Sequence, residues 1–293
     1  MPAFPLWTRR DSTFDQAFAH DWPRPLTKEG PLDRYARWNA LLELLTETGR
    51  ISVEQAAERL AVSQATIRRD FDQLAQQQMI TRTRGGAVVN GVSYDLPLRY
   101  KSAKHASEKQ RIGAAAAALV APAMVVGLTG GTTTTEVARA LAARPDLSGT
   151  GPDGPQLTIV TNALNIANEL IVRSRMKIVV TGGVIRPQSY ELVGPLATGI
   201  LRELTLDMAF LGVDAIDATL GAASHHEGEA AMNSLLASRA RRIVVAADSS
   251  KLGQHAFARV CSIDRVHALV TDATAGDEAI EPFQAVGVEV IRV

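Results

Sequence analysis

The sequence predicts an α/β protein in which a winged helix-turn-helix module precedes a larger, mostly parallel sheet covered by helices. Two observations carry this prediction. Residues 51–89 read, in order, as a helix, a short break, a second helix and a glycine-centred hairpin. From about Ser102 onward, short apolar runs alternate with helical stretches, as in parallel sheets covered on both faces. The 293 residues are enough for both parts, and the second can bury a substantial core.

The first 33 residues follow neither pattern. They contain five prolines and no apolar periodicity: Pro2, Pro5, Pro23, Pro25 and Pro31. Disorder and a start assignment placed too far upstream both explain such a segment, and the sequence leaves the two open. Because no basic region followed by an apolar one is present, we expect no signal peptide.

The first helix of the helix-turn-helix is predicted within residues 51–63, which read ISVEQAAERLAVS. Ser52 and Gln55 have the spacing of a capping box at its start. Its apolar face consists of Ala56, Ala57 and Leu60. The break at Ala61 and Val62 is short enough for a helix-turn-helix.

A second helix is predicted after Ser63, which is a good N-cap residue. Apolar residues then recur at i, i+4 and i+7 and form one buried stripe: Ile67, Phe71 and Leu74. The opposite face carries Ala65, Arg68, Arg69 and Asp72.

The chemistry of this second helix fits the major groove of DNA. Its start is small or polar, which allows a close approach of the backbone: Ser63, Gln64, Ala65 and Thr66. Arg68 and Arg69 can reach guanine edges or phosphates. Phosphates would repel Asp70, so we expect its carboxylate to orient a neighbouring arginine.

A wing is predicted from the β-prone arms 80–83 and 87–89 around Gly85 and Gly86. Arg82 and Arg84 are expected to lie along the DNA backbone. The net charge is zero, so DNA affinity requires a local patch, and residues 34–90 hold eight arginines against six acids. The alternative is a solvated amphipathic helix with ordinary surface arginines, but the order helix, turn, helix, wing favours DNA binding.

The second part contains seven predicted strands, at residues 124–129, 157–161, 177–181, 206–211, 243–247, 268–271 and 288–293. Helices are expected between them, including 134–143, 164–172, 228–241 and 277–286. The Gly- and Pro-rich residues 145–155 are expected to form an exposed loop. The most apolar run, 113–128, is too short for a membrane span and contains Pro122, which favours a buried helix followed by a strand.

Five of these strands end in glycine or polar residues: TGGTTTTE at 129–136, TN at 161–162, TGG at 181–183, Asp214 and DSSK at 248–251. Ligands of parallel sheets bind beyond the carboxyl ends of the strands. The glycines, amides and hydroxyls of the first motif, at a helix N-terminus, suit a phosphate. One such strand end is ordinary turn chemistry, but the coincidence of five predicts a binding site.

Together these motifs resemble the DeoR/GlpR family of bacterial transcription regulators. The resemblance begins near Arg34, where RYARWNALLELLTETGR forms the first helix of the domain, ahead of the helix-turn-helix. It rests chiefly on SQATIRRD at 63–70 and RTRGGA at 82–87. It implies a DNA-binding domain at 34–90, a linker at 91–101 and an effector domain at 102–293. That last domain would be similar in fold to ribose-5-phosphate isomerase and glucosamine-6-phosphate deaminase.

The effector site predicted in this way comprises Gly130, Gly131, Thr132, Thr133, Thr161, Asn162, Gly182, Gly183, Asp214 and Lys251. By the resemblance, residues 131–133 would hold a phosphate, Asn162 and the glycines at 182–183 would line the sugar, and Asp214 and Lys251 would contact polar groups. Thr129 departs from the family pattern, because many members have an acidic residue there.

The function expected is that of a sequence-specific DNA-binding regulator, a repressor of a carbohydrate-utilisation operon that a phosphorylated sugar releases. Its partners would be operator DNA, the effector and further copies in a homodimer or homotetramer. The single cysteine, Cys261, fits a reducing, cytoplasmic compartment. No cofactor or metal is expected, because the neighbouring His225, His226 and Glu227 lack a distant third ligand.

Two other functions compete with this one. A sheet with Asp214, Glu229 and Lys251 at its ligand end could isomerise or deaminate a sugar phosphate, with a carboxylate as general base. Such an enzyme has no need of an amino-terminal winged helix. An architectural DNA-binding protein would leave the predicted pocket unexplained.

Overall fold

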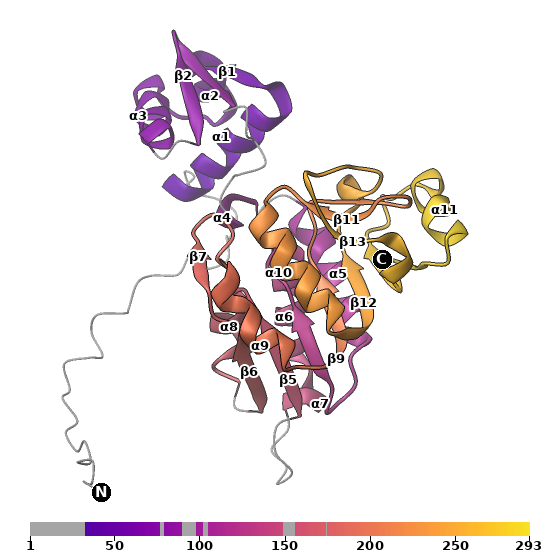
Figure 1. The fold of residues 1–293 in the computed structure, drawn as a ribbon. Coiled ribbons are helices and arrows are strands. Elements are labelled where there is room, and N and C mark those ends of the chain that lie inside the picture. The colour runs from indigo at the N-terminus through magenta and orange to yellow at the C-terminus, as the bar shows by residue number, and fades with distance from the viewer. Residues whose placement is uncertain (1–32, 77–78, 90–97, 102–104, 149–155, 174) are drawn as a thin grey trace, which may run out of the picture.

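The computed structural model describes residues 33–76, 79–89, 98–101, 105–148, 156–173 and 175–293 (Figure 1). The predictions for the first 32 residues, for most of the linker and for residues 149–155 lie outside these ranges. The described chain forms a small helical module, at the top of Figure 1, and a larger sheet domain.

The small module has the predicted winged helix-turn-helix architecture. Its elements are α1 (Arg34–Thr48), β1 (Arg50–Ser52), α2 (Val53–Arg59), α3 (Gln64–Gln76), β2 (Ile80–Thr83) and β3 (Gly86–Val89). The strands form an antiparallel sheet in the order β1-β3-β2. The helix predicted from residue 51 starts at Val53, because residues 50–52 pair with β3 instead.

Local capping fixes where α2 and α3 begin. Ser52 Oγ accepts a hydrogen bond from the N–H of Gln55 at 3.1 Å, and Gln55 Oε1 accepts one from the N–H of Ser52 at 3.0 Å. This confirms the capping box. Ser63 Oγ accepts from the N–H of Thr66 at 3.1 Å, as expected of an N-cap. The predicted apolar stripe of α3 is confirmed as part of the core of the module, and it consists of Ile67, Phe71 and Leu74. The same core contains Trp38, Leu41 and Leu45 of α1.

The larger domain is built on a seven-stranded, fully parallel sheet in the order β15-β14-β12-β9-β4-β5-β6. Its strands are β4 (Val125–Leu128), β5 (Leu157–Thr161), β6 (Met176–Val180), β9 (Leu206–Leu211), β12 (Ala240–Ala246), β14 (Ala268–Thr271) and β15 (Glu289–Arg292). All seven predicted strands are therefore present. β12 starts three residues earlier than predicted, because Ala240 pairs with Leu206 of β9, and the preceding helix ends correspondingly early, at Ser238.

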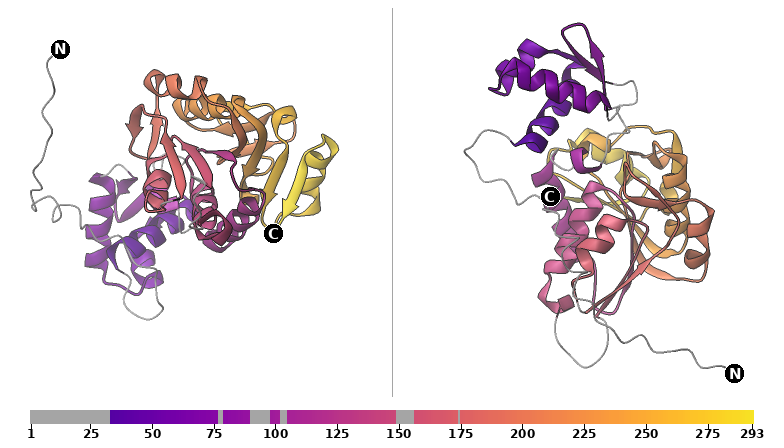
Figure 2. Two further views of the ribbon diagram at one scale, coloured as in Figure 1. Left: turned by 90° about the horizontal axis from the view of Figure 1, so that it is seen from below. Right: turned by 90° about the vertical axis from the view of Figure 1, so that its left-hand side faces the viewer.

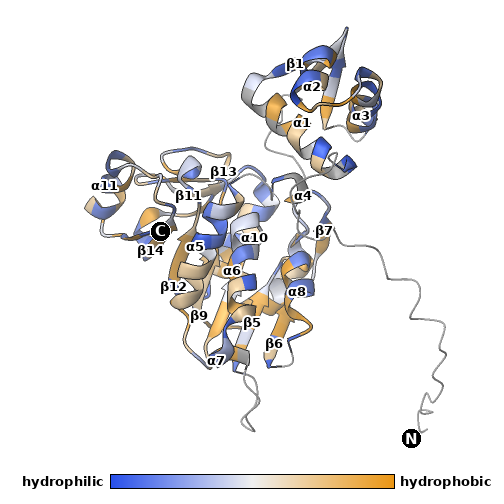
Figure 3. Ribbon diagram, turned by 180° about the vertical axis from the view of Figure 1, so that it is seen from behind, coloured by the Kyte–Doolittle hydropathy of each residue, from blue (hydrophilic) through white to orange (hydrophobic). Residues whose placement is uncertain are grey.

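Helices cover both faces of this sheet (Figure 2). One apolar cluster unites the sheet with α5 (Ala106–Ala118), α6 (Thr132–Ala143) and α8 (Leu164–Leu170). The other unites it with α9 (Thr198–Arg202), α10 (Glu227–Ser238) and α11 (Asp277–Ala285). The strands between them, such as β5, β6, β9 and β12, are largely hydrophobic (Figure 3). Burial on both faces explains their continuous apolar sequences.

Several short elements complete the domain: α4 (Leu98–Lys101), α7 (Pro145–Ser148), η2 (Pro195–Ala197), η3 (Ser249–Lys251) and η4 (Ile263–Arg265). The loop predicted at 145–155 thus opens with a short helix. α4 falls in the predicted linker, yet the N–H of Leu98 donates to the carbonyl of Gln188 at 2.6 Å, which joins α4 to the sheet domain. No helix within the described ranges has the length and apolar character needed to cross a bilayer.

Two antiparallel additions were not predicted. β7 (Val184–Arg186) pairs with β8 (Glu191–Val193), and β10 (Ala215–Asp217), β11 (Gly221–Ser224) and β13 (Ala258–Cys261) form a small sheet. Strands of three or four residues are too short to show the alternation from which a strand is predicted. Both additions follow the carboxyl ends of strands in the large sheet, where the candidate site lies.

Candidate DNA-reading face and effector site

The exposed face of α3 carries the predicted DNA-contacting side chains. Gln64, Ala65, Arg68 and Arg69 are all exposed. Arg68 Nη2 lies 3.4 Å from Gln64 Oε1, one helical turn earlier. Ser63 and Thr66 are partly occupied with capping, and their hydroxyls lie 2.9 Å apart. This face is therefore polar and cationic, with its apolar counterpart fully buried behind it.

Asp70 holds α3 against α1. Its side chain is almost fully buried and accepts hydrogen bonds from Arg37 Nε at 2.5 Å, Arg37 Nη2 at 3.0 Å and Trp38 Nε1 at 2.8 Å. The prediction that the Asp70 carboxylate orients an arginine is confirmed. The arginine comes from α1, however, and not from the neighbouring positions of α3. Only the tertiary fold brings residues 37 and 70 together.

Arg82 braces the wing against α3. It forms an ion pair with Asp72 at 3.0 Å, its guanidinium carbon lies 5.5 Å from the centre of the Phe71 ring, and Nη1 donates to the carbonyl of Gly86 at 3.3 Å. The guanidinium group that makes these contacts is the one predicted to lie along the DNA backbone. Arg84, for which the same position along the DNA backbone was predicted, lies in the turn of the hairpin and is exposed.

The parallel register brings the predicted strand ends to one edge of the sheet. Leu128 of β4 pairs with Thr161 of β5, which pairs with Val180 of β6, while on the other side Leu128 pairs with Phe210 of β9. The loops that follow these strands therefore meet at one edge. In Figure 1 this edge lies on the side of α4 and the winged helix.

The loop between β4 and α6, predicted to hold a phosphate, leads directly into the first turn of α6. Gly131 is the N-cap residue of α6, with φ 133°, and has no side chain to satisfy the first N–H groups of the helix. A Cβ atom at Gly130 would lie within 2.5 Å of the Glu191 carboxyl, so only glycine fits there. Thr132 and Thr133 form the first turn of α6.

Glu191, on β8, lies beside this loop and was missed by the sequence analysis. Its side chain is almost fully buried, and Oε2 accepts a hydrogen bond from Asn162 Nδ2 at 2.8 Å. Burial, together with the charges of Glu229 and Asp214, raises the pKa of Glu191 to about 8. Asn162 Nδ2 also donates to Asn233 Oδ1 at 3.2 Å. Asn162 Oδ1 is buried and has no hydrogen-bond partner among the described residues.

Charged side chains from several separate elements lie in the same region as Glu191. Arg186 of β7 bonds Glu229 of α10 at 3.1 Å, with both side chains largely buried. Lys101 of α4 interacts electrostatically with Asp214, Lys251, Glu229 and Arg186, and burial lowers the pKa of Lys101. Lys101 and Arg186 gave no sequence signal, because isolated basic residues are common on any surface.

The position of Lys251 is fixed by its loop. Asp248 Oδ1 accepts from the N–H of Ser250 at 3.2 Å, and Asp272 Oδ1 accepts from the N–H of Ser249 at 2.7 Å. The N–H of Gly253 donates to the carbonyl of Ile216 at 2.9 Å, which holds the loop against β10. Asp214 precedes β10 and accepts a hydrogen bond from the N–H of His225 at 3.0 Å. Burial lowers the pKa of His225, which favours its uncharged form.

Two of the predicted effector residues have structural roles. The Thr161 hydroxyl donates to the carbonyl of Leu128 at 2.7 Å and accepts from the N–H of Ala163 at 3.0 Å, so it holds neighbouring strand ends together. A Cβ at Gly183 would lie 2.8 Å from the carbonyl oxygen of Val193, which makes Gly183 a close-approach position under the β7–β8 hairpin. Gly182 adopts φ 75° with open space around it.

The two neighbouring histidines, His225 and His226, differ in their contacts. His226 Nδ1 accepts from the N–H of Glu229 at 3.3 Å and caps α10. Within the described ranges, no group of three or more His, Cys, Asp or Glu side chains is placed to hold a metal ion.

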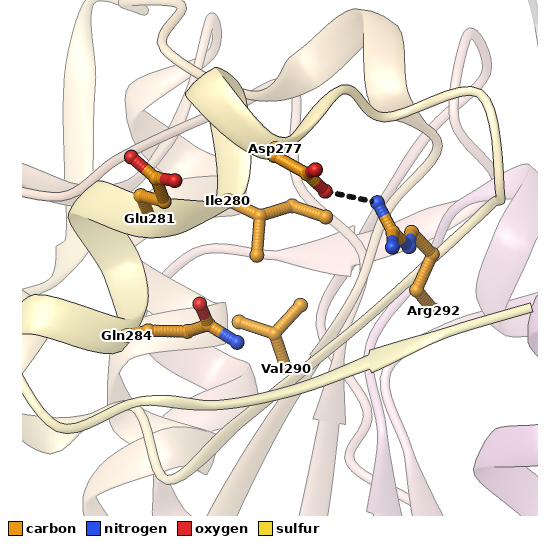
Figure 4. A pocket seen from close by; sticks show the side chains of 6 residues that line it. All are labelled: Asp277, Ile280, Glu281, Gln284, Val290 and Arg292. Atoms are coloured by element: carbon orange, nitrogen blue, oxygen red, sulfur yellow. Dashed lines mark hydrogen bonds and ion pairs between the residues drawn. The ribbon is translucent and has the colours of Figure 1, made fainter.

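A separate pocket of about 290 Å³ lies between α11 and the edge strand β15 (Figure 4). Its lining residues are Asp277, Ile280, Glu281, Gln284, Val290 and Arg292. An ion pair of 2.7 Å joins Asp277 to Arg292 at its rim. None of the predicted effector residues lines this pocket, and its acids are matched by a single arginine, so it is a poor candidate for a phosphate.

A winged helix-turn-helix joined to a parallel α/β domain is the architecture of a DNA-binding regulator with a sensor domain. More particularly, the chain belongs to the DeoR family of transcriptional regulators. Residues 37–92 match the DeoR-like helix-turn-helix domain, and residues 104–273 match the DeoR C terminal sensor domain. Membership of this family favours a regulator over an isomerase or deaminase.

Curated relatives cover most of the chain. The HTH-type transcriptional regulator GlpR of Haloferax volcanii is 32% identical over 262 residues, which cover 89% of this chain and 97% of the relative. The Glycerol-3-phosphate regulon repressor of Escherichia coli K12 is 31% identical over 237 residues, which cover 81% and 90%. Among solved structures, ribose 5-phosphate isomerase A of Methanocaldococcus jannaschii aligns with a TM-score of 0.38 at 19% identity, over 50% of this chain and 55% of the isomerase, a likeness too low to carry an argument.

Proposed function

We propose that this regulator represses a carbohydrate-utilisation operon by binding its operator through α3 and the wing, and that a phosphorylated sugar or polyol releases it. The observation that carries the proposal is that Glu191, which packs on Gly130 of the loop, and Lys101 both interact with Asp214 and Glu229. The name of the E. coli relative supports it, since it refers to a glycerol-3-phosphate regulon and to a repressor.

Each side chain has a distinct role in this proposal. The first amides of α6, with Thr132 and Thr133, bind the phosphate, and Lys251 and Lys101 supply positive charge. Asn162 and Asp214 offer hydrogen bonds to hydroxyl groups of the ligand. Gly182 has open space beside its backbone, which leaves room for the ligand there.

The signal is proposed to reach the DNA-binding module through α4. Lys101 belongs to α4, and the hydrogen bond between Leu98 and Gln188 ties α4 to the turn between β7 and β8. A ligand that pairs with Lys101 therefore acts directly on the chain leading to the winged helix. The ligand shifts the equilibrium only by binding the DNA-free form more tightly than the DNA-bound form.

Two or more copies are proposed to act together. One winged helix makes few phosphate contacts, so useful specificity needs a second copy, with half-sites separated by multiples of about 10 base pairs. We place the contact between copies in the sheet domain, so that each winged helix stays free to reach its half-site.

Release by the effector can be measured as fluorescence anisotropy of an operator duplex selected from a random DNA library. The panel is glycerol 3-phosphate, ribose 5-phosphate and glucosamine 6-phosphate. Thr132→Val, Lys251→Ala and Lys101→Met are expected to keep operator affinity and to raise the effector concentration needed for release at least tenfold. Lys177→Ala, an exposed lysine at the opposite end of β6, is the matched control and should behave as wild type.

Normal release of all three variants would show that the effector binds elsewhere, without affecting the DNA-binding role. Turnover of ribose 5-phosphate or glucosamine 6-phosphate by the purified protein would instead support the isomerase or deaminase alternative.

A further inference from the structure

The Glu191 carboxyl group packs against Gly130, which opens the proposed phosphate loop. A Cβ built on Gly130 would lie 2.5 Å from Glu191 Oε1, so this oxygen packs directly on the residue that opens the loop. The other oxygen, Oε2, accepts the hydrogen bond from Asn162 Nδ2 at 2.8 Å. Oε1 therefore lies beside the loop, while Oε2 accepts from Asn162, and the Asn233 side chain is a further hydrogen-bond partner of the carboxyl group.

Thr129 lies directly before the loop. Many family members have an acidic residue there, but the Thr129 hydroxyl accepts a hydrogen bond from the N–H of Gly212 at 2.9 Å, and its side chain is fully buried. In this chain the acidic group beside the loop comes from β8 and not from the end of β4.

The surroundings of Glu191 are unfavourable for a negative charge. It faces Glu229 of α10 and Asp214 of the loop after β9, whose charges outweigh the opposing hydrogen bonds from Asn162 and Asn233. Arg186 of β7 already pairs with Glu229, and the remaining charged or titratable groups of the cluster are Lys101 of α4, Lys251 of η3 and His225, whose pKa burial lowers. Burial with two nearby carboxylates raises the pKa of Glu191 to about 8, which favours its neutral form.

A phosphate dianion in the loop makes the neutral form necessary. A carboxylate at Oε1 would repel the dianion, whereas a carboxylic acid can donate its proton to an oxygen of the ligand. Asn162 Oδ1, buried without a hydrogen-bond partner among the described residues, lies in the same group and can accept from a ligand hydroxyl.

We propose that Glu191 binds the phosphorylated effector as a neutral carboxylic acid, donating a hydrogen bond to an effector oxygen, so that effector binding takes up a proton. This inference rests on the proposed function, because it assumes that the anion occupies the 130–133 loop. It assigns to Glu191 a specificity-determining contact.

The test uses the full-length protein without DNA and sulfate as the probe, because sulfate remains a dianion across the whole range. Dissociation constants are measured from pH 6.5 to pH 9.5. For wild type, binding should be about tenfold weaker at pH 9 than at pH 7, since the affinity falls as pH rises through the pKa of Glu191, about 8. Glu191→Gln cannot ionise, so its affinity should stay flat with pH and remain near the wild-type value at pH 7.

A second measurement needs no variant. Calorimetric titration of wild type with ribose 5-phosphate at pH 8, in two buffers of different ionisation enthalpy, should show an uptake of roughly half a proton per site. Ribose 5-phosphate is already a dianion at this pH, because its second pKa lies near 6.

The outcomes separate this inference from the function on which it rests. Equal pH dependence in wild type and Glu191→Gln would assign the titration to another group, such as Lys101, and overturn the inference. Binding of sulfate that does not change with pH would do the same while leaving the loop assignment intact. The loop assignment fails if Thr132→Val binds sulfate and ribose 5-phosphate as tightly as wild type does. It also fails if wild type binds neither ligand. In both cases the inference about Glu191 fails with it.

Discussion

Replacing Asp70 by alanine should unfold the winged helix while leaving the sheet domain folded. Asp70 accepts three hydrogen bonds from Arg37 and Trp38, and the Arg37 and Asp70 side chains are only 13% and 3% exposed. Removing one partner of such a buried pair costs about 3 to 5 kcal/mol, because the other charge loses its hydrogen-bonded counter-charge while it stays largely buried. A module of this size has a total stability of about 3 to 8 kcal/mol. The Asp70→Ala module should therefore be marginally folded at best.

Trp38 provides a direct assay. The other tryptophans are Trp7 and Trp22, so replacing both by phenylalanine leaves Trp38 as the single fluorescent tryptophan, in the core of the winged helix. Urea unfolding followed by its fluorescence reports on this module, while circular dichroism reports on the whole chain. Asp72→Ala is the matched control: the same residue type on the same helix, but 60% exposed and paired only with Arg82, so the change should stay within about 1 kcal/mol.

A loss of less than about 1 kcal/mol for Asp70→Ala would refute this reasoning. It would mean that α3 is held by its apolar stripe alone and that the contacts with Arg37 and Trp38 add nothing. Comparable losses for Asp70→Ala and Asp72→Ala would point instead to a general effect of charge on α3.

Two further predictions concern DNA and assembly. Arg69→Ala should weaken binding to operator by about 1 to 3 kcal/mol with little effect on random duplex, whereas Arg84→Ala should weaken binding to both duplexes equally. Titrations of each variant against the two duplexes measure these losses. An equal loss on both duplexes for Arg69→Ala would rule out base reading by Arg69. The fragment 98–293, which keeps α4, should sediment as a dimer or tetramer at micromolar concentration. A monomeric fragment alongside an oligomeric full-length chain would place the contact between copies outside the sheet domain.

The sequence by itself determined the elements whose signals are local. The N-cap at Ser63, the capping box at Ser52 and the stripe of Ile67, Phe71 and Leu74 depend on spacings within one or two helical turns. The seven strands of the large sheet were predicted because burial on both faces makes each a continuous apolar run. The rule that ligands bind at the carboxyl ends of parallel strands then located the edge of the candidate site without any coordinates.

Only the tertiary structure decided which side chains share that edge and what surrounds each charge. Glu191 and Arg186 lie on strands of three residues, too short to give a periodic signal, and Lys101 comes from a segment that was predicted as a linker. The roles of Asp70 and Glu191 follow from partners and burial, and both of these depend on residues distant in the chain. Spacing along a sequence specifies helices and strands, whereas the ionisation of a carboxyl group depends on the solvent it loses and the charges it meets after folding.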